Sequence, residues 1–187
     1  MNLKKIFEPR AVVIILICSI LFGFLANILL DWVDKLIYPE EYYEIVMKYS
    51  EEYSVPSELV FAIIKVESNF EPDAKSHVGA LGLMQMIPST YEWLAKDILS
   101  EPFVHSSMLY DPSTNIKYGT YYLRYLHSKF DSWELAIIAY NWGEGNLSRF
   151  IEEHGYNEGD YDSIPVSETR NYVKKVMHHW EKYDELY

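Results

Sequence analysis

An almost entirely apolar run near the beginning of the sequence divides the chain into two parts of different character. Residues 11–30 read AVVIILICSILFGFLANILL and include no charged side chain. A helix of about 20 residues is about 30 Å long, which matches the hydrocarbon thickness of a membrane. Because no face of such a helix is polar, a buried helix of a soluble core is disfavoured. We therefore predict one N-terminal transmembrane helix over residues 11–30.

The charges on either side of this run predict its orientation. Basic residues precede the run and acidic residues follow it: Lys4, Lys5, Arg10, Asp31 and Asp34. Positively charged flanks stay in the cytoplasm, so residues 1–10 are expected inside the cell and the C-terminal part outside it. A cleaved signal peptide is the alternative, but Phe24 occupies a position before Ala26 where a cleavage site usually has a small residue. We expect an uncleaved, single-pass anchor in the cell membrane.

The composition narrows the possible functions of the rest of the chain. The formal net charge is -12, whereas a nucleic-acid-binding domain needs a basic surface, so no nucleic-acid partner is expected. The single cysteine, Cys18, can form neither a disulfide framework nor a cysteine-based zinc site within the chain. His178 and His179 are adjacent and point about 100° apart on a helix, so they are poorly placed to share a metal ion. No metal site and no cofactor is predicted.

The sequence after the apolar run is predicted to be mostly α-helical. Residues 31–53 form a charged, tyrosine-rich connector in which Pro39 can begin a helix. Apolar residues with helical spacing follow: Leu59, Ile63, Val66 and Phe70. Further helices are predicted over residues 88–99 and 115–130, from a Ser132 cap to Tyr140, and from a Ser167 cap onward. A small irregular or hairpin element is expected at residues 74–86. The domain itself is expected to cover residues 54–187.

Glu67 is the first candidate for chemistry because it lies at the end of an apolar helical segment. Val60, Ile63 and Ile64 precede it by one or two helical turns and therefore share its face. Apolar surroundings raise the pKa of a carboxyl group. A glutamic acid that stays protonated near neutral pH can donate its proton to a glycosidic oxygen. For this residue taken alone, an exposed glutamate at a helix end is the alternative.

Four short motifs, taken in order, resemble those of a known family. They are Glu67-Ser68, Gly79-Ala80-Leu81-Gly82-Leu83-Met84-Gln85, Ala139-Tyr140-Asn141-Trp142-Gly143 and Glu168-Thr169-Arg170-Asn171-Tyr172-Val173. Together they resemble the catalytic domain of the soluble lytic transglycosylases (SLT), the lysozyme-like family 23 of glycoside-cleaving enzymes. The resemblance covers residues 53–180. It implies a lysozyme-like helical domain with a central substrate cleft.

The resemblance implies a role for five residues on the predicted helices. Glu67 would be the sole catalytic acid and base, with Ser68 beside it to help to hold the substrate. Tyr140 and Asn141 would face Glu67 across the cleft, and Tyr172 would hydrogen-bond or orient its carboxyl group. The pattern alone leaves simpler alternatives open: Ser68 as a helix-surface hydroxyl, both tyrosines as core residues, and Asn141 as a helix C-cap.

The glycine-rich motif is expected to form part of the cleft. The resemblance implies that Gly79 and Gly82 let the backbone approach the glycan, and that Met84 and Gln85 line the cleft, Gln85 through hydrogen bonds. Both glycines can alternatively be ordinary turn residues. Trp142 departs from the family, which commonly has a small residue at that position. It either adds a stacking surface for a sugar or packs in the core.

The function implied by the resemblance is that of a membrane-anchored peptidoglycan lytic transglycosylase. Such an enzyme cleaves the β-1,4 bond between N-acetylmuramic acid and N-acetylglucosamine and leaves a 1,6-anhydro ring. Most glycosidases use two carboxylates. None of the other carboxylates weighed for a second role falls on a matched motif position: Glu71, Asp73, Glu92, Asp111 and Glu144. The expected partners are peptidoglycan glycan strands and, through the N-terminal helix, the membrane. Two alternatives remain: a hydrolase of goose-type lysozyme character and a non-catalytic glycan-binding membrane module.

Overall fold

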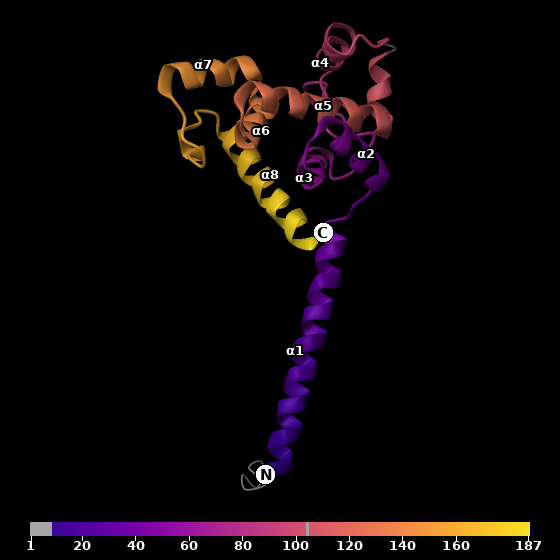
Figure 1. Ribbon diagram of the computed structural model, residues 1–187, viewed down its shortest axis with the longest axis vertical. Helices are drawn as coiled ribbons and strands as arrows, with labels where there is room; N and C mark the ends of the chain where they lie inside the picture. Colours follow the sequence, from indigo (N-terminus) through magenta and orange to yellow (C-terminus); the bar gives the residue numbers. More distant parts are fainter. Residues whose placement is uncertain (1–8, 104) are drawn as a thin grey trace. The chain divides into compact units, whose positions relative to one another are not determined.

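The chain divides near Pro39 into an N-terminal helix and a larger group of helices (Figure 1). The computed structural model describes residues 9–103 and 105–187. Contacts between residues group positions 40–185 into one unit and leave the N-terminal helix outside it. The larger unit therefore begins before residue 54, the boundary predicted from the sequence.

The N-terminal helix α1 (Pro9–Ile37) contains the predicted membrane segment. From Arg10 to Ile37 it is long and apolar enough to cross a membrane, although a signal sequence would meet the same requirements of length and composition. The helix continues past residue 30, and Lys35 Nζ lies 3.3 Å from Asp31 Oδ2 in this last part. A pair of opposite charges at this spacing favours continued helix. Lys4 and Lys5, on which the predicted orientation partly depends, lie outside the described residues.

The larger unit is built from helices, as the sequence predicted. They are α2 (Tyr43–Tyr53), α3 (Ser57–Ser68), α4 (Pro88–Trp93), the π-helical η2 (Leu94–Ile98), η3 (Ser106–Tyr110), α5 (Pro112–Phe130), α6 (Trp133–Trp142), α7 (Glu144–His154), η4 (Tyr161–Ser163) and α8 (Ser167–Leu186). Within residues 9–103 and 105–187, extended pairing is limited to two isolated bridges, Lys75 with Leu81 and Leu81 with Met86. These bridges form the small irregular element predicted at residues 74–86.

Helix α5 is the helix against which α2, α6 and η3 pack. The backbone N–H of Thr114 donates to Asp111 Oδ2 over 2.8 Å, and Pro112 occupies the first turn, so the helix begins before the predicted residue 115. Farther along, Ile116, Leu123 and Leu126 are fully buried. This continuous apolar face makes α5 the support on which the surrounding helices hold the site residues.

Helix α2 belongs to the larger unit, although its residues were predicted to form a connector. Val46 and Tyr49 are buried, and the Tyr49 hydroxyl lies 3.3 Å from Ser113 Oγ at the start of α5. The Tyr53 ring meets Tyr121 edge-on, with 5.1 Å between ring centroids. The polar and tyrosine-rich composition concealed this packing face, because a tyrosine can bury its ring and keep its hydroxyl hydrogen-bonded.

Two further helix ends differ from the sequence prediction, and one helix was missed. Ser167 does not cap α8: it is the first helical residue, and the preceding Val166 is extended and provides no side-chain cap. Gly143, with φ 89°, is the C-cap of α6, so the interpretation of Asn141 as a cap is wrong. Helix α7, which lies between Gly143 and Gly155, was not predicted. Tertiary packing of its buried Leu147 stabilises it.

Candidate active site

The structure brings Glu67 and Tyr172 together from helices far apart in the sequence. Glu67 lies in the last turn of α3, and Tyr172 lies on α8. The Tyr172 hydroxyl donates a hydrogen bond to Glu67 Oε1 over 2.7 Å. Tyr172 is buried, with 7% of its surface exposed, so it is also a core residue, as the simpler interpretation of the sequence predicted. The residue both packs in the core and orients the carboxyl group.

The surroundings of Glu67 favour its protonated form. Val60, Ile63 and Ile64, on the preceding turns of α3, are fully buried. Burial raises the pKa of Glu67 from 4.5 to about 7, and the hydrogen bond from Tyr172 acts in the opposite direction. Within residues 9–103 and 105–187, no second carboxylate contributes to this pKa. Glu67 therefore has the properties of a general acid that works alone near neutral pH.

Tyr140 approaches the same carboxyl group from α6. Its hydroxyl donates to the backbone carbonyl of Met84 over 2.8 Å and lies 3.3 Å from Met86 Sδ. Burial raises the pKa of the Tyr140 hydroxyl well above 10, and the negative charge of Glu67 raises it further. The same two causes act in the same order on Tyr172. Both phenols therefore remain protonated hydrogen-bond donors beside Glu67.

The turn at residues 81–86 is held in place by Asn115, a residue that the sequence analysis did not assign to the site. Its Nδ2 donates to Leu81 O over 2.8 Å and to Leu109 O over 2.7 Å. Its Oδ1 accepts from the backbone N–H of Met84 over 2.7 Å. Asn115 is fully buried on the face of α5 that also contains Gly119. A polar residue within the apolar face of the predicted helix could have indicated this role in the sequence, because a buried amide must have hydrogen-bond partners.

Ser68 and Gln85 fix the same turn from other directions. Ser68 Oγ lies 2.8 Å from Leu83 O and 3.1 Å from Ile64 O, so this hydroxyl connects α3 to the turn. Gln85 Nε2 donates to Gly82 O over 2.8 Å and to Ala74 O over 3.2 Å. Both side chains are therefore held by bonds to backbone carbonyls of the protein. Gln85 also lines the pocket described below.

Gly82 and Met84 have structural roles that differ from the predicted ones. A Cβ atom at Gly82, whose φ is 74°, would lie 2.1 Å from Leu109 O. The residue is buried, so close packing of the turn requires glycine there, and the expected approach of its backbone to a glycan stays a prediction. The Met84 side chain is fully buried, and its sulfur would lie 2.4 Å from a Cβ at Gly119. It therefore packs on α5 and does not line a cleft.

A pocket of about 220 Å³ opens beside Tyr140. Its lining combines the end of the turn, the start of α4, one residue of α5 and the end of α6: Gln85, Met86, Ile87, Thr90, Tyr122, Tyr140, Asn141, Trp142 and Gly143. Asn141 is exposed, and its Oδ1 accepts from the buried Thr169 of α8 over 2.9 Å. Trp142 is partly exposed and packs on Phe150 at 5.7 Å between ring centroids. Trp142 therefore packs on Phe150 and also lines the pocket, and its role as a stacking surface for a sugar stays a prediction.

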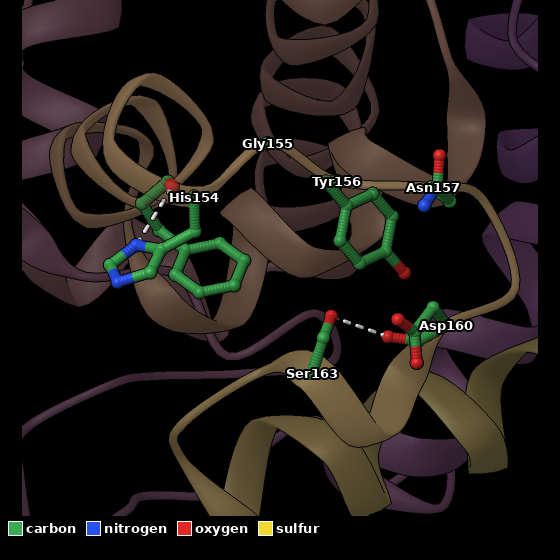
Figure 2. Close-up of a pocket in the computed structure, with 7 residues that line it drawn as sticks. His154, Gly155, Tyr156, Asn157, Asp160 and Ser163 are labelled. Atoms are coloured by element: carbon green, nitrogen blue, oxygen red, sulfur yellow. Dashed lines mark hydrogen bonds between the residues drawn. The ribbon is translucent and has the colours of Figure 1, made fainter.

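A larger pocket, of about 520 Å³, includes none of the predicted site residues. Figure 2 shows that His154, Tyr156, Asp160 and Ser163 surround it at the end of α7 and in the following loop. Glu134 holds this loop, because its carboxylate accepts from the hydroxyl of Tyr156 over 2.7 Å and from the backbone N–H of Gly159 over 2.8 Å. Across residues 9–103 and 105–187, no three His, Cys, Asp or Glu side chains are grouped to bind a metal ion.

The sequence that carries this partly buried acid matches a known family. The family model described as "Transglycosylase SLT domain" matches residues 44–162. The chain belongs to this family. The match includes α2 and so agrees with a helical unit that begins near residue 40. Tyr172 lies beyond the matched residues, and its connection to this SLT site comes from the geometry of α8.

Curated SLT relatives include soluble and membrane-bound proteins. The soluble lytic murein transglycosylase of Escherichia coli K12 is 35% identical over 147 residues, which cover 75% of this chain and 22% of the relative. The membrane-bound lytic murein transglycosylase C of Actinobacillus pleuropneumoniae serotype 5b is 32% identical over 169 residues, covering 76% of this chain and 46% of the relative. The chain thus spans less than half the length of either relative.

Solved SLT structures show the same lysozyme-like fold that the sequence predicted. The 70 kDa soluble lytic transglycosylase SLT70 of Escherichia coli superimposes with a TM-score of 0.74 and 33% identity, covering 79% of this chain and 25% of that one. An inactive Slt mutant of Pseudomonas aeruginosa, in which one glutamate is replaced by glutamine, has a TM-score of 0.73 and 31% identity, with 79% and 24% covered. The mostly α fold class is therefore confirmed.

Proposed function

We propose that this protein is a peptidoglycan lytic transglycosylase in which Glu67 acts first as an acid and then as a base. The observation that carries the proposal is the hydrogen-bonded, partly buried Glu67, whose pKa is raised to about 7 without help from another carboxylate among the described residues. The membership of the SLT family supports the reaction class. So do relatives that are named lytic murein transglycosylases.

In the proposed reaction, protonated Glu67 donates its proton to the oxygen that joins N-acetylmuramic acid to N-acetylglucosamine. The bond from that oxygen to the muramic acid C1 breaks, and the substrate's acetamido group stabilises the positive charge that develops at C1. The Glu67 carboxylate then removes the proton of the C6 hydroxyl, whose oxygen attacks C1 and forms the 1,6-anhydro ring. Glu67 ends protonated, as it began, and no water is consumed.

The neighbouring residues have supporting roles in this proposal. Tyr172 keeps the Glu67 carboxyl in place through its 2.7 Å hydrogen bond. Tyr140 and Asn141 line the pocket of about 220 Å³, where the Asn141 amide can bind a polar group of the sugar. Gln85 lines the same pocket, and Ser68 holds the adjoining turn. In this proposal, Tyr140, Asn141 and Gln85 bind the sugar from the pocket, and Ser68 supports the adjoining turn.

The location follows from α1, which we propose to be an uncleaved single-pass anchor with residues 40–185 outside the cytoplasm. Its composition suits a membrane span. Arg10 precedes the apolar segment, and Asp31 and Asp34 follow it, which favours a cytoplasmic N-terminus. Membrane-bound relatives of the same family are consistent with anchoring. The glycan strands of the cell wall are then the partner that the enzyme meets.

The deciding experiment is product analysis of purified sacculi digested by the whole chain in detergent micelles. We expect mass spectrometry to find muropeptides with anhydro ends. Muropeptides with reducing ends only would instead identify a hydrolase. Glu67→Gln should lower turnover by at least about a hundredfold, the low end for general acid catalysis. Glu152→Gln, at an exposed position on α7, is the matched control and should leave turnover unchanged.

A further inference from the structure

The pocket of about 520 Å³ at the end of α7 contains none of the residues used in the proposed reaction. Its volume lies in the range of roughly 300–1,000 Å³ that is typical of small-molecule sites. Phe150 lines the pocket from α7, and its ring stacks with that of His154 at 5.1 Å between ring centroids. Polar residues of the loop between α7 and η4 line the rest. The pocket therefore combines an aromatic wall with polar groups, as ligand sites do.

The loop that lines this pocket is fixed to the beginning of α6. Besides Tyr156 and Gly159, the Glu134 carboxylate also accepts from the hydroxyl of Tyr161 over 3.1 Å. Ser132, the N-cap of α6, donates from its hydroxyl to the carboxylate of Glu158. These bonds hold the loop in one conformation without any ligand. A ligand that binds to a preformed site loses less affinity to the ordering of the protein.

Several polar side chains of the pocket have already given their hydrogens to the protein. Ser163 Oγ donates to Asp160 O over 2.7 Å (Figure 2), and the Tyr156 hydroxyl donates to Glu134. The Nδ1 atom of His154 lies 3.3 Å from a backbone carbonyl one turn earlier, which can only accept. A neutral His154 ring therefore presents Nε2 as an acceptor. What these three side chains offer to a ligand is lone pairs, so the pocket suits a group that is rich in donors.

The carboxylate of Asp160 adds a negative charge to these acceptors. Asp160 is exposed, and within residues 9–103 and 105–187 its carboxylate takes part in no hydrogen bond or ion pair. The residues that line the pocket include no lysine or arginine. A primary ammonium group carries three N–H donors and one positive charge, and aromatic faces such as those of Phe150 and Tyr156 attract it. The hydrogen bonds and the charge of the pocket thus favour the same kind of ligand.

One pair of aromatic side chains connects this pocket with the pocket beside Tyr140. Phe150 lines the larger pocket and packs on Trp142 at 5.7 Å between ring centroids, and Trp142 lines the smaller pocket. A peptide of three residues spans at most about 10 Å when extended. A short peptide attached to a sugar in the smaller pocket is therefore long enough to pass this pair of rings.

We propose that the larger pocket binds the ammonium group of a diamino acid in a peptide stem of the glycan strand, with Asp160 as its counter-ion. This inference rests on the proposed function, because the stem arrives on the strand that is cut at Glu67. In a cross-link between strands, this amino group is converted into an amide and loses its charge. The pocket therefore makes the enzyme prefer strands whose stems are not cross-linked.

The test uses uncross-linked glycan strands whose stems end in the diamino acid, and the same strands after acetylation of its amino group. For the unsubstituted chain in detergent micelles, we expect acetylation to lower kcat/KM about tenfold, the low end for a hydrogen bond to a charged group. Asp160→Asn should lower kcat/KM on the unmodified strands by a similar factor. Because both changes remove the same interaction, this variant should no longer distinguish the two batches.

The matched control is Asp162→Asn, an exposed position of the same loop outside the pocket lining. This variant should distinguish the two batches as well as the unsubstituted chain does. An equal loss of discrimination in both variants would assign the effect to the general charge of the loop and overturn the site. Equal kcat/KM of the unsubstituted chain on both batches, or undiminished discrimination by Asp160→Asn, would overturn it as well.

A binding measurement keeps the proposal testable if Asp160→Asn does not fold. The backbone amide signals of Gly155 and Asn157, in the isotopically labelled Glu67→Gln chain, should shift with the unmodified strands and not with the acetylated ones. Unshifted signals at saturation would refute the site. An equal shift with a soluble lysine-containing tripeptide at the same concentration would assign the pocket to unattached peptides instead. Failure of the proposed function gives a different result: the unsubstituted chain would form no Glu67-dependent product from either batch.

Discussion

Replacing Glu67 with glutamine is expected to make the protein more stable at alkaline pH, although it removes the proposed acid. Burial raises the pKa of this carboxyl group from 4.5 to about 7 in the folded protein. A raised pKa means that the folded state binds the proton more tightly than the unfolded state does. The resulting stabilisation is fully present below about pH 4.5 and is lost as the pH rises through about 7.

The size of this loss follows from the difference between the two pKa values. Each pH unit between 4.5 and about 7 lowers the free energy of unfolding by about 1.4 kcal/mol, which comes to roughly 3 kcal/mol. Glutamine keeps the shape of the side chain, carries no charge at any pH, and therefore avoids this loss. The variant should thus exceed the unsubstituted protein in stability by roughly 3 kcal/mol near pH 8 and by little or nothing near pH 4.

Denaturant-induced unfolding of both proteins in detergent micelles, at about pH 4 and about pH 8, measures this difference. Glu152→Gln, on the exposed surface of α7, controls for the general effect of removing one negative charge. If Glu67→Gln gained no stability over the unsubstituted protein between the two pH values, the carboxyl group would not be penalised by burial. The physical basis for its role as an acid near neutral pH would then be lost.

Two further substitutions test the contacts that surround Glu67. Tyr172→Phe removes the hydrogen bond that lowers the Glu67 pKa. The pH at which kcat/KM on sacculi falls should therefore move upward by about one to two pH units. An unchanged pH profile would contradict the 2.7 Å contact. Asn115→Ala leaves three buried backbone groups without their amide partner and should lower the free energy of unfolding by at least about 3 kcal/mol. Asn157→Ala, at an exposed position, is the control and should change this free energy little. Similar values for both variants would show that Asn115 does not hold the turn.

Much of the helical framework and the identity of the acid could be predicted from local sequence. Helical spacing located α3 and the greater part of α5, and a Ser132 cap marked the start of α6, where the Leu135 N–H donates to Ser132 Oγ over 3.4 Å. Glu67 was marked by its apolar neighbours on one helix, which are local as well. Such features depend on residues within a few turns of one another, so a linear sequence displays them.

The contacts that shape the site could not be predicted in the same way. Asn115 lies 31 residues after the Met84 N–H that it binds, and nothing in either local sequence indicates the pairing. Gly82 was interpreted as a site for close approach of a ligand, whereas its neighbour is the carbonyl of Leu109. The sequence reports that a residue is small or polar, but only the tertiary arrangement decides whether substrate or protein lies against it.

The turn at residues 81–86 is held mainly by bonds that end on main-chain atoms. Ser68, Asn115 and Tyr140 come from three different helices and contact the backbone of Leu83 or Met84. Main-chain atoms are common to all residues, so these bonds do not depend on which side chains the turn presents to the pocket. Ile87, at the end of the turn, is 38% exposed and lines the pocket. A substitution of Ile87 can therefore change which ligand groups the pocket contacts, while the backbone of the turn keeps its geometry.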